Sequence, residues 1–253
     1  MVNYEKHIYE LETLGYSIVE NVFDNSLLHK LKESLKKALE KDQEMFAGKG
    51  SKRPELAVDL SIHDPVFIKA LDNDIIYELC SRVLGNPILY SYTSTILKPR
   101  EYSLVHNIHI DANNKFIANY ISGLVMTIPL EDFTEENGAT LYLPGSQNLE
   151  QQPSEETFSK YAVSTARSAG DILFFNPRVY HRAAHNNTDK IRYGLTAYAT
   201  RSFFKQRFDF PRMIPKENLE GLSVRLLSFL GFNSQPPDSV EKYYLSSQKT
   251  TSM

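Results

Sequence analysis

The chain has 253 residues, of which 42% are hydrophobic and 23% charged, and its formal net charge is −3. This composition is typical of globular proteins and excludes the fibrous and intrinsically disordered classes. The small negative charge argues against nucleic-acid binding. No run reaches the roughly 18 apolar residues of a membrane helix, and the N-terminus lacks the apolar core of a secretory signal. Because Cys80 is the only cysteine, we expect no disulfide and a reducing compartment, the cytoplasm.

The first third of the chain is predicted to be helical. Apolar residues recur there at helical spacing, and Asp, Asn and Ser residues offer N-caps. The predicted segments are residues 4–14, a helix from residues 24–26 to about residue 45, and residues 64–84. A short strand-like stretch, 16–19, lies between the first two. The sequence therefore predicts a helical N-terminal layer over residues 1–87.

The character of the sequence changes after residue 87, where short β-rich runs follow one another with turn residues between them. These runs are residues 88–97, 103–111, 120–130, 139–143, 160–165, 171–175, 179–184 and 191–200. About eight short strands without intervening helices indicate a jelly roll or closed barrel. We therefore expect one domain, 1–253: the helical layer, a double-stranded β-helix (cupin-like jelly-roll) core over residues 88–200, and a C-terminal extension, 201–253.

A pair of candidate metal ligands, His109 and Asp111, lies at the end of the second β-rich run. Alternate residues of a strand point to the same face, so one imidazole and one carboxylate can enter the same interior. A second histidine would complete the two-histidine, one-carboxylate set of non-haem iron(II), which leaves metal positions open. The alternative interpretation of His109 is a buried, hydrogen-bonded histidine near a turn aspartate.

His181 is the best third ligand. It follows the apolar run 171–175 and the turn around Asn176-Pro177, so it faces the interior if the strand alternation continues. His106 and His185 flank the ligands in sequence, and we expect them to be structural or to support the ligands. The sequence suggests no catalytic residue beyond the metal ligands.

The order of these motifs resembles that of the phytanoyl-CoA dioxygenase family of iron(II)- and 2-oxoglutarate-dependent oxygenases. The pair at His109 is followed by the turn-rich segment 136–147, the Gly170-Asp171 turn, His181 and, eleven residues later, Arg192. The segment LGYSIVENVF, residues 14–23, also looks like the opening of that family. The resemblance covers roughly residues 8–200.

The resemblance implies that His109, Asp111 and His181 bind iron(II). It also implies that Arg192 binds the distal carboxylate of 2-oxoglutarate. The chemistry agrees, because a guanidinium forks onto a carboxylate through two parallel hydrogen bonds, and a buried charge in a strand-like run needs a partner. The alternative is that Arg192 points to solvent beside Lys190.

Two further positions match family positions that line the 2-oxoglutarate pocket, Thr127 and Ser94. Thr127 departs from the family, which sometimes has tryptophan there. Gln147 also departs from the family's commoner histidine, a position outside the metal ligands. Thr127 and Ser94 are therefore predicted cofactor-binding residues on the resemblance alone.

The implied reaction hydroxylates a C–H bond of a small molecule with dioxygen, while 2-oxoglutarate is converted to succinate and carbon dioxide. In related halogenases a small residue replaces the carboxylate ligand, so Asp111 favours hydroxylation. The sequence does not identify the substrate or the oligomeric state. Basic residues suggest a rim for an anionic substrate; the alternative is a solvated surface segment. They are Arg201, Lys205, Arg207, Arg212 and Lys216, with Lys52, Arg53, Lys98 and Arg100.

Two other functions remain open. The first is a different metal-dependent cupin-type enzyme, such as an isomerase or a dioxygenase without 2-oxoglutarate; such sites usually contain more histidines, and Arg192 would then have no role. The second is a non-catalytic jelly-roll protein that binds a small molecule. Succinate release that depends on iron(II) and 2-oxoglutarate separates the proposed enzyme from both.

Overall fold

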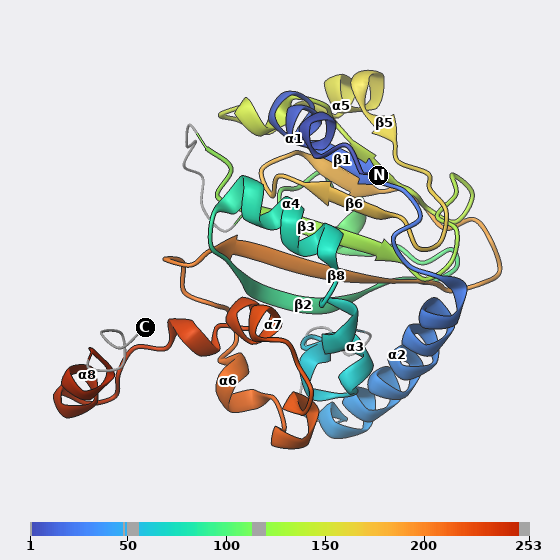
Figure 1. The fold of residues 1–253 in the computed structure, drawn as a ribbon. Helices are drawn as coiled ribbons and strands as arrows, with labels where there is room; N and C mark the ends of the chain where they lie inside the picture. The colour runs from blue at the N-terminus through green and yellow to red at the C-terminus, as the bar shows by residue number, and fades with distance from the viewer. Residues whose placement is uncertain (1, 48, 50–55, 113–119, 248–253) are drawn as a thin grey trace.

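The computed structural model describes residues 2–47, 49, 56–112 and 120–247 (Figure 1). Its strands form two antiparallel sheets. The five-stranded sheet has the order β1 (Tyr16–Val19), β6 (Ile172–Phe175), β3 (Gly123–Pro129), β8 (Arg192–Arg201) and β2 (Pro87–Leu97). The three-stranded sheet has the order β5 (Val163–Ser164), β4 (Thr140–Tyr142) and β7 (His181–Ala183). The structure thus has the predicted double-stranded β-helix core.

Helices cover one face of the larger sheet (Figure 1). The α-helices are α1 (Tyr4–Thr13), α2 (Asn25–Phe46), α3 (Pro65–Ala70), α4 (Asp74–Leu84), α5 (Glu155–Tyr161), α6 (Phe210–Met213), α7 (Val224–Phe229) and α8 (Val240–Ser247). Short 3-10 turns are η1 (Leu60–Ile62), η2 (Leu104–His106), η3 (Ser146–Asn148), η4 (Lys216–Leu219) and η5 (Phe232–Ser234). Among the described residues, no helix combines the length and apolar character needed to cross a bilayer.

Side-chain N-caps explain where helices of the N-terminal layer begin. The Asp24 side chain accepts a hydrogen bond from the Leu27 N–H at 2.9 Å, and the Asn73 side chain accepts one from Ile75 N–H at 2.9 Å. Such caps satisfy amide groups that have no partner within the helix. The N-terminal layer is not purely helical, because β1 pairs along its length with β6 at the edge of the larger sheet.

Strand alternation divides the larger sheet into two chemically different faces. On β8, Leu195, Ala197 and Ala199 belong to the core shared with the helices. On the same strand, Arg192 and Thr196 line the cavity between the two sheets. Because successive side chains point to opposite faces, one strand contributes to both the hydrophobic core and the cavity wall.

Two of the predicted β-rich runs are wrong in part. Residues 103–111 contain the turn η2 and only an isolated bridge at His109. The backbone N–H of Ser103 donates to Nδ1 of His106 at 2.9 Å, which closes a turn that the β-rich composition does not reveal. Residues 160–165 begin in α5, which Ser154 caps by accepting the Thr157 N–H at 3.1 Å. A local side-chain hydrogen bond therefore outweighs strand propensity in both places.

Candidate active site

Backbone pairing brings the two predicted histidine ligands side by side. His109 and His181 form an isolated antiparallel bridge in which each amide donates to the other's carbonyl at 3.0 Å. The Asp111 amide donates to the carbonyl of Pro177 at 2.8 Å. The turn before β7 thus holds the extended segment of Asp111, so all three predicted residues meet at one end of the cavity.

The ligand atoms of His109, Asp111 and His181 lie within 4.8 Å of one another. Each Asp111 carboxylate oxygen faces a different imidazole, with 3.8 Å between Oδ1 and Nε2 of His109 and 3.8 Å between Oδ2 and Nε2 of His181. These separations are too long for hydrogen bonds. They leave room for an ion whose bonds to nitrogen and oxygen would each be about 2 Å.

Both rings present the same nitrogen to the centre. Nδ1 of His109 donates to the carbonyl of Asn107 at 2.8 Å, and Nδ1 of His181 donates to the carbonyl of Val179 at 2.9 Å. Carbonyl oxygens only accept, so Nδ1 carries the proton in each ring and Nε2 keeps its lone pair for a metal. Burial lowers the pKa of His181, which favours the neutral ring that a metal requires.

Aromatic side chains fix the orientation of His181. The Tyr142 ring stacks on it with 5.0 Å between centroids and 13° between planes. The Phe175 ring meets its side at 5.0 Å. Tyr142 belongs to the smaller sheet and Phe175 to the larger, so the metal end of the cavity is enclosed from both sides.

The inner cavity of about 200 Å³ extends from these three residues to Arg192, and its other walls come from both sheets. The Arg192 side chain is buried, with only 2% of its residue surface exposed. One guanidinium nitrogen donates to the carbonyl of Gly138, and the group lies 4.1 Å above the centroid of the Phe133 ring. Burial first, and then the positive charge of Arg167, lower the Arg192 pKa to about 9, so the group remains charged at neutral pH.

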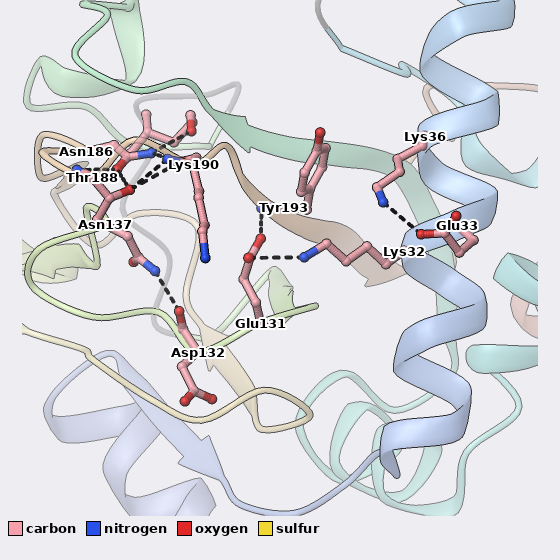
Figure 2. A network of polar contacts seen from close by, with 11 residues as sticks. Lys32, Glu33, Lys36, Glu131, Asp132, Asn137, Asn186, Thr188, Lys190 and Tyr193 are labelled. Carbon is pink, nitrogen blue, oxygen red and sulfur yellow. Dashed lines mark hydrogen bonds and ion pairs between the residues drawn. The ribbon is translucent and has the colours of Figure 1, made fainter.

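A network of polar contacts around Tyr193 holds the start of β8 (Figure 2), the strand whose first residue is Arg192. The next residue, Tyr193, donates its amide to Glu131 Oε1 at 2.7 Å, and Lys32 of α2 donates to Glu131 Oε2 at 3.1 Å. Before Arg192 in the sequence, the carbonyl of Lys190 accepts a hydrogen bond from the Asn186 side chain at 2.8 Å. The backbone that carries Arg192 is therefore held by bonds to both neighbouring segments.

Thr127 and Ser94, which were predicted on the resemblance alone, have different surroundings. The Thr127 hydroxyl, in the wall of the inner cavity, accepts a hydrogen bond from Arg167 at 2.7 Å. Ser94 contributes to the same wall, but its hydroxyl accepts the Ala57 amide at 2.9 Å. The register partner of Ser94 is Leu195, which belongs to the helix-side core. Thr127 is thus better placed than Ser94 to meet a ligand.

A larger cavity of about 580 Å³ meets the inner one at Asp111. Its volume falls in the usual range of small-molecule sites. The Tyr90 and Tyr198 rings, with centroids 4.9 Å apart, line it together with hydroxyl groups of β2 and β8. Arg207 also lines it, and within the described chain its side chain has no hydrogen bond or ion pair. Asp111 therefore stands between two compartments.

The structure changes the predicted basic rim. Arg201 lies on the helix side and donates to carbonyls at the end of α4. Arg100 pairs with Asp189, Lys98 with Glu101 and Arg212 with Asp209. Lys52 and Arg53 lie outside the described residues. Of the predicted cations that the structure describes, Arg207 alone lines the larger cavity.

Sequence reasoning missed several cavity residues. These are Thr93, Thr95, Thr140, Tyr142, Thr196 and Tyr198, which line one or both cavities. The alternation of Thr93 and Thr95 on one strand and of Thr196 and Tyr198 on its partner is a sequence signal for a polar face. Gln147, the departure from the family's histidine, donates to the carbonyl of Glu12 at 3.1 Å and so holds α1.

Comparison with known proteins identifies the family of this chain. The family model of phytanoyl-CoA dioxygenase matches residues 11–194. The chain belongs to this family. The phytanoyl-CoA dioxygenase family consists of iron(II)- and 2-oxoglutarate-dependent oxygenases, so the predicted class of enzyme and both predicted cofactors are confirmed.

Three known proteins show how similar the chain is to others. An uncharacterized protein of Mycobacterium tuberculosis is 24% identical over 245 residues, which cover 92% of this chain and 89% of the relative. The dioxygenase sphC of Aspergillus fumigatus is 26% identical over 246 residues, which cover 88% and 66%. EctD from S. alaskensis, solved with 2-oxoglutarate and 5-hydroxyectoine, is 16% identical with a TM-score of 0.67, covering 79% of this chain and 77% of EctD. The last similarity supports the fold.

We predict that Gly138, whose carbonyl accepts a hydrogen bond from Arg192, does not tolerate a side chain. Its φ of +89° disfavours any side chain, and an added Cβ would lie 2.3 Å from Leu97 and 2.5 Å from the carbonyl of Ala184. Gly138→Ala should lower the free energy of unfolding by more than about 1–3 kcal/mol, the cost of such backbone strain alone. Urea unfolding measures this change.

Gly85→Ala is the matched control, because Gly85 has a φ of +81° but nothing within 4 Å of its added Cβ. It carries the backbone strain without the clash. Equal losses of stability in the two variants would contradict the tight packing described around Gly138.

Proposed function

We propose that the protein hydroxylates a C–H bond of a small anionic organic molecule, using iron(II), dioxygen and 2-oxoglutarate. The observation that carries the proposal is the meeting of two cavities at Asp111. The inner cavity joins the three candidate ligands to the buried Arg192, which suits a dicarboxylic 2-oxo acid. The outer cavity has the volume of a small-molecule site and one cation, Arg207, in its wall.

In this proposal His109, Asp111 and His181 hold the metal. Their donor set is the two-histidine, one-carboxylate combination that suits iron(II) and leaves positions open for other ligands. Bound iron(II) would supply dioxygen activation coupled to the decarboxylation of 2-oxoglutarate to succinate and carbon dioxide. The carbonyls of Asn107 and Val179 keep the imidazole protons on Nδ1, so each ring presents Nε2 throughout.

Arg192 would bind the distal carboxylate of 2-oxoglutarate and so orient the opposite end toward the metal ligands. Thr127 would add a hydroxyl beside that carboxylate. We assign Ser94 to the shape of the wall, because its hydroxyl already accepts an amide. Asp111 favours hydroxylation over halogenation, because its carboxylate would occupy the metal position that a halide needs.

Removing a metal ligand should abolish metal binding. Asp111→Ala deletes the carboxylate that faces both imidazoles, and His181→Ala deletes the buried ring. Titration with nickel(II) under anaerobic conditions should give one site in the wild type and none in either variant. His185→Ala is the control, because its ring stacks on His106 with centroids 4.5 Å apart, outside the ligand set. Retention of the site in Asp111→Ala would remove Asp111 from the metal centre.

Arg192→Ala should weaken 2-oxoglutarate binding by about 2–5 kcal/mol, the usual loss when one partner of a buried charged pair is deleted. Calorimetric titration of the nickel(II)-loaded protein measures the change, and nickel(II) affinity serves as the internal control. An unchanged affinity for 2-oxoglutarate would show that Arg192 does not contact this ligand.

The whole proposal is tested by succinate release. Iron(II)-loaded protein is incubated in air with 2-oxoglutarate and a panel of small carboxylates, phosphates and neutral analogues. We expect an anionic compound to stimulate succinate release and to gain one oxygen atom, detected by mass spectrometry. Turnover without 2-oxoglutarate would favour another cupin-type enzyme, and stoichiometric binding without any turnover would favour a binding protein.

The anionic character of the substrate is tested by Arg207→Gln. The substitution should raise the KM for the substrate by about two- to fivefold, the range for a partly exposed ion pair of up to 1 kcal/mol. Lys205→Gln, an exposed residue that does not line the cavity, is the matched control. Equal effects of both substitutions would contradict a direct contact with Arg207.

A further inference from the structure

A second buried guanidinium, Arg167, lies beside the inner cavity. Only 8% of its residue surface is exposed. Its backbone pairs with Phe133 through two hydrogen bonds of 2.9 Å, and its guanidinium lies 4.9 Å from the centroid of the Phe133 ring. Arg192 lies over the same ring at 4.1 Å. Two cations therefore share one aromatic side chain at the end of the cavity that is remote from the metal ligands.

No carboxylate among the described residues forms an ion pair with either guanidinium. The partners of Arg167 are neutral: the carbonyl of Thr165 at 3.0 Å and the hydroxyl of Thr127 at 2.7 Å. The Nε–H groups of Arg167 and Arg192 have no hydrogen-bond partner within the described chain. Buried charges without counter-charges destabilise a protein unless an anion binds beside them.

Both groups are charged at neutral pH. Burial lowers the pKa of Arg167 to about 10 and is also the first cause of the lowered Arg192 pKa. Because the lowered pKa values belong to cations, the folded protein is destabilised by them while they are protonated. An anion between the metal ligands and this pair would offset that cost.

The Thr127 hydroxyl connects Arg167 to the cavity. Its oxygen accepts from Arg167, which leaves its own hydrogen to be donated to another acceptor. Thr127 and Arg192 line the same inner cavity. A carboxylate bound at Arg192 would be a strong acceptor for the hydroxyl, because a hydrogen bond to a charged oxygen is roughly twice as strong as a neutral one.

We propose that Arg167 is a positioning residue that orients the Thr127 hydroxyl toward the distal carboxylate of 2-oxoglutarate and, with Arg192, makes this end of the cavity selective for a 2-oxo acid with a second negative charge. The inference rests on the proposed role of Arg192. It adds a residue that lies outside the cavity lining and contacts the ligand only through Thr127.

The test compares two 2-oxo acids on nickel(II)-loaded protein by calorimetry. 2-Oxoglutarate carries the distal carboxylate, and 2-oxobutyrate keeps the chelating end but lacks it. Arg167→Met should weaken 2-oxoglutarate binding by about ten- to a hundredfold, the equivalent of a charge-assisted hydrogen bond of 1.5–3 kcal/mol, and leave 2-oxobutyrate binding nearly unchanged. Arg167→Lys should recover part of the preference, because it keeps the charge and one donor but not the planar fork.

Two further variants test the connection through Thr127. Thr127→Val should lower the preference for 2-oxoglutarate by a similar factor, and combining it with Arg167→Met should add little. Arg201→Met is the matched control. Arg201 lies on the same sheet as Thr127, but its side chain donates to carbonyls of α4 on the opposite face. It should leave the ratio of the two affinities unchanged.

Each outcome bears on one claim. Equal weakening of both 2-oxo acids in Arg167→Met would overturn the inference, because the residue would then only support the fold. An unchanged ratio would overturn it as well, and additive effects of the Thr127 and Arg167 substitutions would overturn the connection through the hydroxyl. Absence of 2-oxoglutarate binding to the wild type would instead contradict the proposed function.

Discussion

The alternation of side chains along β8 is the constraint on which the rest of the site depends. Its odd-numbered residues Leu195, Ala197 and Ala199 pack under the helices, while Arg192 and Thr196 line the cavity. A slip of one residue in its pairing with β2 and β3 would bury the apolar set in the cavity and move the guanidinium to the helix side. The hydrophobic core therefore fixes the position of the cofactor-binding charge.

The second feature is an imbalance of charge. Two imidazole rings and one carboxylate lie at the metal end of the cavity, and two guanidinium groups without an acidic partner in the described chain lie at the opposite end. Such a site is costly in the free protein and complementary to a ligand with an anionic tail and a metal-chelating head. Substrate and cofactor would then occupy two compartments that adjoin along a shared wall, which includes Asp111.

Much of this arrangement could be predicted from the sequence, because strand alternation and N-caps are local. Local spacing brought His109 and Asp111 together, and the order of motifs pointed to His181 and Arg192. Arg167 could not be found in this way, since a backbone bridge to Phe133 and a hydrogen bond to Thr127 bring it to the cavity from a segment distant in sequence. The basic rim predicted over residues 201–216 was wrong for most of its residues for the same reason. Only tertiary contacts distinguish Arg207, in the cavity wall, from Arg201, which donates to carbonyls at the end of a helix. Around residues 103–106, a side-chain hydrogen bond made a turn where composition favoured a strand.

The most direct test of this account is a crystal structure of the protein with nickel(II) and 2-oxoglutarate. The account predicts one metal ion bound by Nε2 of both His109 and His181 and by the Asp111 carboxylate. It also predicts the distal carboxylate within hydrogen-bond distance of the Arg192 guanidinium. A metal held by other residues, or a 2-oxoglutarate carboxylate directed away from Arg192, would contradict it.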